Sequence, residues 1–299
     1  MPPYGQFIFG HEYAGDVVAV GSSVDEFRVG DRVVVEAHMG CRRCENCIRG
    51  LYTACLNFGN TKRGHRANGF TTNGGLAEYA LNHINTLYRI PEGVSYEEAV
   101  VVMTAGSPLY GLERAGGYFA GETVAVLGPG PIGLMALQLV KALGAVRVIL
   151  IGTRPARLAL GKELGADVIV NSREQEPVGT VREATGGRGA DVTIDCAGGD
   201  DTFDTAIKMT KPGGRVILVA FYHGPVTADV SDAVRRNLTI YTERGEGGTS
   251  VGRALALLAA GRLRAQPLVS QCFPLAEVHR GFEVVEKRIG DPIKVIFHP

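Results

Sequence analysis

A glycine pattern near the middle of the chain constrains its fold most. Gly128, Gly130 and Gly133 form G-x-G-x-x-G between residues 123–128, which predict a strand, and residues 131–144, which predict a helix. There the first glycine makes a tight turn, the second lets the backbone approach a pyrophosphate, and the third lets helix and strand pack. The helix N-terminus offers free N–H groups to phosphates. We therefore predict a dinucleotide-binding loop, rather than an unliganded turn, at Gly128, Gly130, Pro131, Ile132 and Gly133.

Strands and helices alternate after this loop. Strands that alternate with helices imply a parallel sheet covered on both faces. The sequence therefore predicts an α/β fold with a Rossmann-type, doubly wound parallel sheet. The further strands are predicted at 146–151, 168–170, 191–196, 215–221 and 238–241, and the further helices at 155–165, 177–186 and 201–210.

The residues after the second of these strands bear on the choice of cofactor. An NAD site places Asp or Glu roughly 20 residues past the glycine loop, where the carboxylate binds the ribose 2′-hydroxyl. Here that place holds Gly152, Thr153 and Arg154. The glycine leaves space, the threonine supplies a donor, and the arginine supplies a guanidinium suited to a phosphate. We therefore predict NADP rather than NAD; the alternative is that Arg154 is a solvated surface residue.

The parts of the chain before and after this region differ from it. Short β-branched runs bounded by glycine and aspartate are typical of a small barrel. They predict strands at 16–21, 31–36, 76–79 and 84–90. The last part predicts helices at 251–260 and 275–287 and strands at 268–272 and 294–297.

Four cysteines lie close together in the first part. Cys41, Cys44, Cys47 and Cys55 have the spacing C-x2-C-x2-C-x7-C, and four thiolates can close a tetrahedral structural zinc site. An iron–sulfur cluster is the alternative, but its cysteine run needs a fourth cysteine at position 51, which is leucine. We therefore predict a structural zinc lobe at about 40–56, with no open coordination position for chemistry.

Composition excludes several classes of protein. A length of 299 residues favours two domains, and 45% hydrophobic with 21% charged residues excludes a disordered or fibrous chain. Lys and Arg (31) balance Asp and Glu (31), so the basic excess of a nucleic-acid binder is missing. No apolar run approaches the ~20 residues of a membrane span, and the start does not read as a signal peptide. We expect a cytoplasmic protein with reduced thiols, in which Cys196 and Cys272 are core residues.

Together these features resemble the zinc-containing medium-chain alcohol dehydrogenase family, specifically its secondary-alcohol and sorbitol dehydrogenase-like members. The resemblance covers nearly the whole chain and implies a GroES-like β-barrel domain joined to a Rossmann domain. The implied boundaries are 1–103 for the barrel domain, 104–246 for the Rossmann domain, and 247–299 for a part that returns to the barrel domain. The motifs that carry the resemblance are Gly10-His11-Glu12, G-D-R-V at 30–33, the four cysteines, G-G-L-A-E-Y at 74–79, and the glycine loop followed by 152–155.

The resemblance also implies a catalytic zinc, with His11 as ligand and Glu12 beside the metal. Family members carry an N-terminal segment with a first cysteine ligand, whereas here no cysteine precedes Cys41, so we expect the barrel to lack that segment. The third ligand position falls on Met103, or with a one-residue shift on Thr104, and neither binds Zn²⁺ well. A truncated or misassigned start, a natural short form without catalytic zinc, and a ligand from His38 or His65 all remain open.

The implied activity is hydride transfer between NADP(H) and a secondary alcohol, ketone or polyol, with zinc as Lewis acid. One alternative is a zinc-free NADPH-dependent carbonyl or quinone reductase, which Met103 favours. The other is an inactive truncated chain that binds NADP and structural zinc only. The resemblance implies a homodimer or homotetramer, and no nucleic acid or membrane partner is expected. The substrate stays open.

Overall fold

The computed structural model describes residues 7–299, and the chain divides into two compact units. Unit 1 contains the described residues up to Gly106 together with Arg244–Gly261 and Ala265–Pro299. Unit 2 contains Ser107–Glu243 with Arg262–Arg264. Within residues 7–299, no helix combines the length and the apolar character that a membrane crossing requires.

Unit 2 is built on one six-stranded sheet with the strand order β6-β5-β4-β7-β8-β9. All five strand pairs are parallel. This is the order of a doubly wound dinucleotide-binding sheet, so the predicted α/β class is confirmed. The strands are Thr123–Leu127 (β4), Arg147–Gly152 (β5), Val168–Asn171 (β6), Ala190–Asp195 (β7), Thr210–Leu218 (β8) and Thr239–Thr242 (β9).

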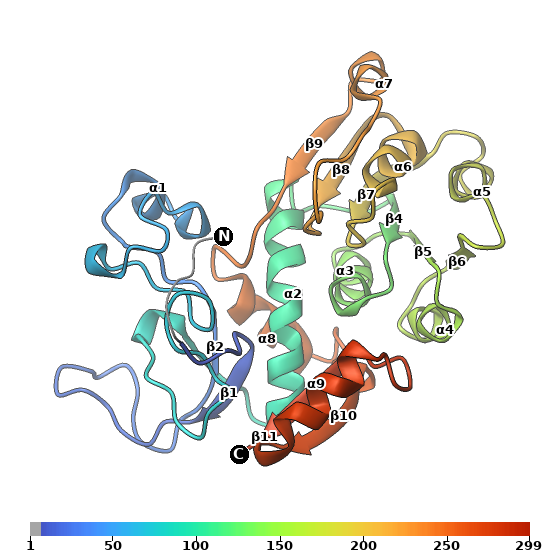
Figure 1. Ribbon diagram of the computed structural model, residues 1–299. Helices are drawn as coiled ribbons and strands as arrows, with labels where there is room; N and C mark the ends of the chain where they lie inside the picture. The colour runs from blue at the N-terminus through green and yellow to red at the C-terminus, as the bar shows by residue number, and fades with distance from the viewer. Residues whose placement is uncertain (1–6) are drawn as a thin grey trace. The chain divides into compact units, whose positions relative to one another are not determined.

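Helices cover both faces of this sheet. Figure 1 shows α3 and α4 on one side and α5 and α6 on the other. The central strands are therefore buried on both faces, which explains their continuous apolar runs, such as the fully buried Val148, Ile149 and Leu150. Proline at the first helical position begins α3, α4 and α5, where its missing N–H costs no hydrogen bond. The helices are Pro131–Ala142 (α3), Pro155–Glu163 (α4), Pro177–Ala184 (α5), Thr202–Met209 (α6) and Val230–Arg235 (α7).

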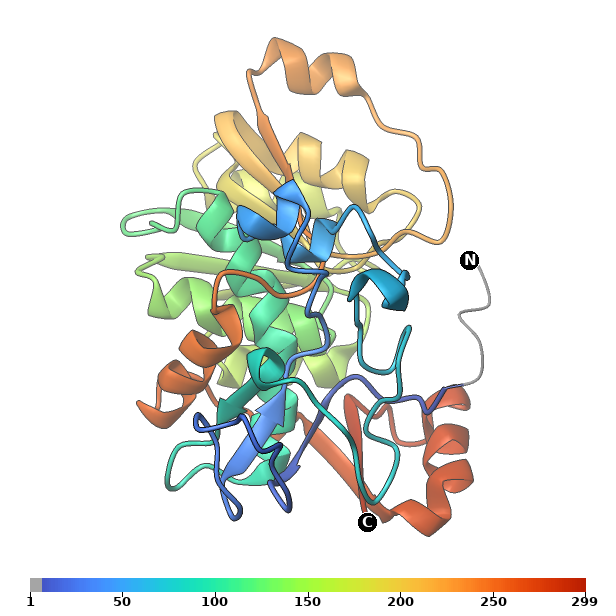
Figure 2. The same ribbon diagram turned by 90° about the vertical axis from the view of Figure 1, so that its left-hand side faces the viewer.

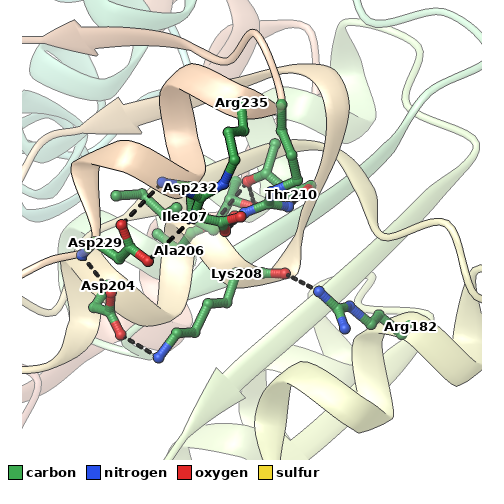
Figure 3. A network of polar contacts seen from close by, with 11 residues as sticks. Arg182, Asp204, Ala206, Ile207, Lys208, Thr210, Asp229, Asp232 and Arg235 are labelled. Atoms are coloured by element: carbon green, nitrogen blue, oxygen red, sulfur yellow. Dashed lines mark hydrogen bonds and ion pairs between the residues drawn. The ribbon is translucent and has the colours of Figure 1, made fainter.

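Charged side chains from neighbouring segments hold helix α6 (Figure 3). Arg182 of α5 donates to the carbonyl oxygen of Lys208 at 3.1 Å, and the Lys208 ammonium pairs with Asp204 at 2.5 Å. Asp204 also accepts from the backbone N–H of Asp229, just before α7, at 2.9 Å. Since the last carbonyls of a helix have no partner within it, such contacts satisfy the helix end and fix its neighbours.

Arg236 makes three further contacts in this part of unit 2. Its guanidinium donates to the carbonyl oxygens of Ile207 (2.5 Å) and Thr210 (2.6 Å) and pairs with Asp232 (2.6 Å). We expect Arg236→Ala to lower the free energy of unfolding by about 2–3 kcal/mol in urea denaturation, because two carbonyls and a carboxylate lose their partner. Arg235→Ala is the control: that side chain is 66% exposed, and the variant should change stability by less than about 0.5 kcal/mol. Equal losses in both variants would contradict this account.

Unit 1 holds two small sheets and several helices. The first sheet is antiparallel in the order β1-β2-β3, and the second pairs β10 with β11 in parallel. Figure 2 shows α9 alongside the β10–β11 pair. The strands are Tyr13–Asp16 (β1), Arg32–Val35 (β2), Leu87–Arg89 (β3), Val269–Pro274 (β10) and Lys294–His298 (β11); the α-helices are Glu45–Ile48 (α1), Ser250–Ala259 (α8) and Val278–Glu286 (α9).

Helix α2 (Tyr96–Arg114) spans the division between the units, which falls after Gly106. It begins with a reciprocal cap. The Ser95 hydroxyl accepts from the Glu98 N–H at 3.1 Å, and the Glu98 carboxylate accepts from the Ser95 N–H at 3.2 Å. This pairing satisfies two backbone donors that the first helical turn leaves free.

Several sequence expectations in unit 1 were wrong. The strand predicted at 16–21 lies earlier, at β1, and the one predicted at 84–90 is a 3-10 turn (Ile84–Thr86) followed by β3. Residues 76–79 form no strand, because the preceding glycines pack against the chain at residues 9–13: a Cβ at Gly74 would lie 2.0 Å from the Gly10 carbonyl oxygen. Cys272 is exposed on β10 rather than in the core, and Cys196 is only partly buried.

Candidate functional site

The glycine loop joins β4 to α3 at the carboxyl edge of the unit 2 sheet. Gly128 has a φ of +94° and donates its N–H to the carbonyl oxygen of Ile151, at the end of β5, at 2.8 Å. A Cβ at Gly133 would lie 1.9 Å from the Gly128 carbonyl oxygen, so only glycine allows this approach. A Cβ at Gly130 would meet nothing within 4 Å. The loop is therefore tightly packed at Gly133 and open at Gly130.

This open face suits a dinucleotide pyrophosphate. Gly130 is the N-cap residue of α3 and offers no side-chain cap, while Pro131 and Ile132 open the helix. The first turn carries no acidic side chain. Uncapped N–H groups and the positive end of the helix dipole therefore point to a face that no side chain fills, which is the arrangement an anionic phosphate needs.

Gly152, Thr153 and Arg154 lie at the same edge, because β4 and β5 are parallel neighbours that pair Leu127 with Ile151. The space beside Gly152 is taken by Pro129: a Cβ at Gly152 would lie 2.3 Å from the Pro129 ring. Gly152 therefore packs against the glycine loop, and its role in cofactor binding stays a prediction. Thr153 is exposed and Arg154 is partly buried just before α4, so these two supply the polar groups here.

Asp195, at the end of β7, escaped the sequence analysis. This fully buried carboxylate accepts from the N–H groups of Ala197 (2.8 Å) and Gly198 (3.1 Å) and from the hydroxyls of Thr202 (2.6 Å) and Tyr222 (2.5 Å). It thus fixes the turn after β7, which packs against the glycine loop, since a Cβ at Gly128 would lie 2.9 Å from Ala197. The sequence feature that could have identified Asp195 is its place at the end of an apolar strand, three residues before the pair Gly198-Gly199.

The four cysteines of unit 1 converge as predicted. The sulfur atoms of Cys41, Cys44, Cys47 and Cys55 all lie within 4.8 Å of one another. The Cys41–Cys47 and Cys44–Cys55 sulfur distances are 3.9 and 4.0 Å, close to the about 3.8 Å between ligands in a tetrahedral Zn–S site. Asn57 donates to Cys41 (3.2 Å) and to Cys55 (3.3 Å), and such donors stabilise thiolates. The donor set therefore fits a closed structural zinc site.

His11 and Glu12 lie in a different part of unit 1. The Nε2 atom of His11 is 3.9 Å from the Glu12 carboxylate, and Lys294 of β11 forms an ion pair with Glu12. Partial burial lowers the pKa of His11. The Glu12 charge is therefore already compensated by an ammonium group within the protein.

A second histidine lies near His11. The ring of Phe70 packs against His11 (centroids 4.5 Å apart) and against His38 (5.7 Å). His38 Nδ1 lies 3.3 Å from the carboxylate of Glu246, and both side chains are largely buried. The sequence analysis did not find Glu246, because 208 positions separate it from His38.

Glu36, on the segment that leads to His38, is buried beside this pair. Its carboxylate accepts from the hydroxyls of Tyr52 and of Tyr88, the latter at 2.8 Å. Burial, together with the nearby Glu246, raises the pKa of Glu36 to about 7, although the two hydrogen bonds act to lower it. The raised pKa means that this buried place favours the uncharged form of Glu36.

These residues do not fit a three-ligand catalytic zinc site. Among residues 7–299, the only group of three or more potential ligands that converges is the four cysteines. Met103 is buried in α2, and the Thr104 hydroxyl donates to the Val101 carbonyl at 2.7 Å. His65, the other candidate ligand, packs on Phe58 and accepts from the Gly59 N–H at 3.1 Å. Neither His38 nor His65 joins His11 and Glu12 in a ligand set.

Comparisons with known proteins place this geometry in a family. Residues 1–92 match the alcohol dehydrogenase GroES-like domain, and residues 131–260 match the zinc-binding dehydrogenase family. The chain is 32% identical to an L-threonine 3-dehydrogenase of Bacillus licheniformis over 300 residues, covering 100% of this chain and 83% of the relative. The chain belongs to the zinc-containing medium-chain alcohol dehydrogenase family.

Other family members extend the likeness. The sorbitol dehydrogenase of Bacillus subtilis is 31% identical, over 98% of this chain and 81% of its own length. A chain from Sinorhizobium meliloti 1021, described as a candidate zinc-binding dehydrogenase bound to NADP, has a TM-score of 0.89 and 28% identity, covering 98% of this chain and 84% of that one. As a member of this family, the protein is an oxidoreductase with a GroES-like and a Rossmann part.

Proposed function

We propose that this dehydrogenase transfers a hydride between NADP(H) and a secondary alcohol or polyol and the corresponding ketone. The observation that carries the cofactor assignment is the edge shared by β4 and β5. There an open phosphate-binding face at Gly130 lies beside a strand end that carries Thr153 and Arg154 and no carboxylate. A cofactor with a 2′-phosphate needs a cation and tolerates no carboxylate at this position.

The residues of unit 2 have separate roles in this proposal. The N–H groups at the start of α3 bind the pyrophosphate, and Gly130 lets it approach the backbone. Arg154 and Thr153 bind the 2′-phosphate. Asp195 holds the turn beside the glycine loop. When bound, the nicotinamide supplies or accepts the hydride, and the protein orients it.

The relatives support the reaction class but leave the substrate open. They are named for L-threonine and for sorbitol, both of which carry a secondary alcohol. The NADP bound to the Sinorhizobium meliloti chain shows that a similar fold accepts this cofactor. The homodimer or homotetramer implied by the resemblance stays a prediction, as does location in the cytoplasm.

Arg154 tests the cofactor assignment. We expect Arg154→Ala to raise the Kd for NADPH about thirtyfold, because the loss of charged hydrogen bonds to a phosphate costs about 2 kcal/mol. The Kd for NADH, measured by the same fluorescence titration, should change less than about twofold. Arg147→Ala, at the opposite end of β5, is the matched control and should leave both constants unchanged. Equal weakening of NADPH and NADH by Arg154→Ala would refute the assignment.

A further inference from the structure

The residues around His11 and Glu12 lack the third protein ligand that the family resemblance implies for a catalytic zinc ion. The resemblance puts Met103, or with a one-residue shift Thr104, at the place of the third zinc ligand. Met103 is buried, and the Thr104 hydroxyl donates to a backbone carbonyl. Glu12 is paired with Lys294, and no third ligand from residues 7–299 converges on His11. A zinc ion that activates a substrate needs three protein ligands and one open position. Without such an ion, the negative charge on the substrate oxygen must be met by a proton from a residue of the chain.

We propose that His38, held by Glu246, donates and accepts this proton, and that His11 binds no zinc. The pair has the arrangement of a general base with its orienting carboxylate: an imidazole whose Nδ1 faces a carboxylate, leaving Nε2 for another partner. This inference rests on the proposed hydride-transfer function. It assigns the proton step to residues of the chain itself.

The backbone around His38 fixes its position. His38 forms an antiparallel bridge with Ala67, and the next residue donates its N–H to the Arg66 carbonyl at 3.0 Å. Phe70 packs on the imidazole from the same loop. The ring therefore lies between a fixed strand-like segment and an aromatic face, so its rotation is restricted.

Glu246 is equally constrained: one glycine makes room for its side chain, and another makes room for the His38 ring. Gly245 has a φ of +70°, and a Cβ there would lie 3.3 Å from the His38 ring. A Cβ at Gly106, one turn beyond Met103 on α2, would lie 2.8 Å from the Glu246 side chain. Glu246 thus occupies space that a larger residue on α2 would fill. The carboxylate that lies near this turn of α2 is therefore Glu246, from the segment before α8, and it faces the imidazole of His38.

The step balances without a metal. In the direction of reduction, the hydride reaches the carbonyl carbon, the protonated His38 gives its proton to the carbonyl oxygen, and solvent returns a proton to His38. In oxidation the neutral imidazole takes the hydroxyl proton as the hydride leaves. Glu246 is a positioning residue, because it orients the imidazole and stabilises its protonated form.

The first measurement is the zinc content of the purified full chain by elemental mass spectrometry. We expect about one zinc per chain, unchanged in His11→Ala and near zero in Cys55→Ser. About two zinc ions per chain, with one lost in His11→Ala, would overturn the proposal. This readout does not depend on activity.

The second measurement is the pH dependence of kcat for ketone reduction. We expect His38→Asn to lower kcat about 100-fold and to remove the limb of the profile that reports the acid, and Glu246→Gln to lower kcat about tenfold. The charged or titratable groups near His38 include Glu246, Glu36, His11 and His65, so the limb of the pH profile is also measured in Glu246→Gln. His279→Asn, on the exposed face of α9, should keep the wild-type profile.

The outcomes separate the proposals. Normal NADPH binding and an unchanged zinc content show that His38→Asn is folded. If His38→Asn does not fold, the kcat of Glu246→Gln tests the proton role in its place. A kcat of His38→Asn within about threefold of wild type would overturn the proton role alone. If the wild-type chain binds NADPH but reduces no ketone, the proposed function fails and the proton role fails with it. In that case the zinc content still shows whether His11 binds a zinc ion.

Discussion

Replacing Cys55 by serine is expected to remove zinc and to unfold the lobe around it. Three cysteines cannot close the tetrahedral site, and a structural zinc ion contributes about 10–16 kcal/mol to the folding of small zinc modules. We expect the zinc content to fall from about one ion per chain to near zero, and the free energy of unfolding to fall by about 5 kcal/mol or more. Elemental analysis and urea denaturation measure both quantities.

The size of this effect follows from how little else holds the lobe. Its α-helix, Glu45–Ile48, has four residues and no buried side chain, and Ile48 is 74% exposed. Only Cys41, Thr53 and Cys55 are buried between residues 41 and 55. Cys272→Ser is the matched control, because that sulfur is exposed on β10 and should leave zinc and stability unchanged. Retention of zinc in Cys55→Ser would contradict the assignment of Cys55 as a required ligand.

The second large effect is expected from Gly133→Ala. The added Cβ would lie 1.9 Å from the Gly128 carbonyl oxygen and 3.4 Å from the Cβ of Cys196, and backbone cannot yield as a flexible side chain does. We expect a loss of about 3 kcal/mol in the free energy of unfolding and loss of NADPH binding, because the strand–helix packing that forms the loop is disrupted. Thermal unfolding and fluorescence titration measure the two effects.

Gly130→Ala separates stability from binding in the same loop. Gly130 has an ordinary φ of −82°, and its Cβ would meet nothing within 4 Å. Stability should therefore stay the same or rise by about 0.5 kcal/mol, while NADPH binding weakens at least about tenfold, because the methyl group occupies the face that the pyrophosphate needs. If Gly130→Ala bound NADPH normally, the pyrophosphate would not lie on this loop.

The Rossmann half was predictable because its signals are local. The predicted bounds of the first strand (123–128) and first helix (131–144) differ by no more than two residues from those of β4 and α3. A buried parallel strand, a glycine turn and a helix that begins with proline can each be recognised from a short stretch of sequence. The four-cysteine site was equally readable, because all its ligands lie within fifteen positions. The packing of Gly152 against Pro129 was not predictable in this way, because it depends on the loop of a neighbouring strand.

Unit 1 was harder for the same reason. Residues 76–79 have strand-like composition, but glycines 74 and 75 pack against the chain near residues 9–13 and prevent strand pairing. The pairs His38–Glu246 and Lys294–Glu12 join positions 208 and 282 apart, and no local pattern predicts such partners. In irregular segments such as these, tertiary contacts determine the backbone conformation and override the local strand propensity.

The most direct test of the central claim is the initial rate of cofactor reduction by the full chain. NADP⁺ and NAD⁺ are each supplied with sorbitol, 2,3-butanediol and L-threonine, and formation of the reduced cofactor is followed by absorbance. We predict turnover of at least one alcohol, with kcat/KM for NADP⁺ at least about tenfold above that for NAD⁺. Binding of NADP⁺ without turnover of any alcohol, or a preference for NAD⁺, would contradict the account.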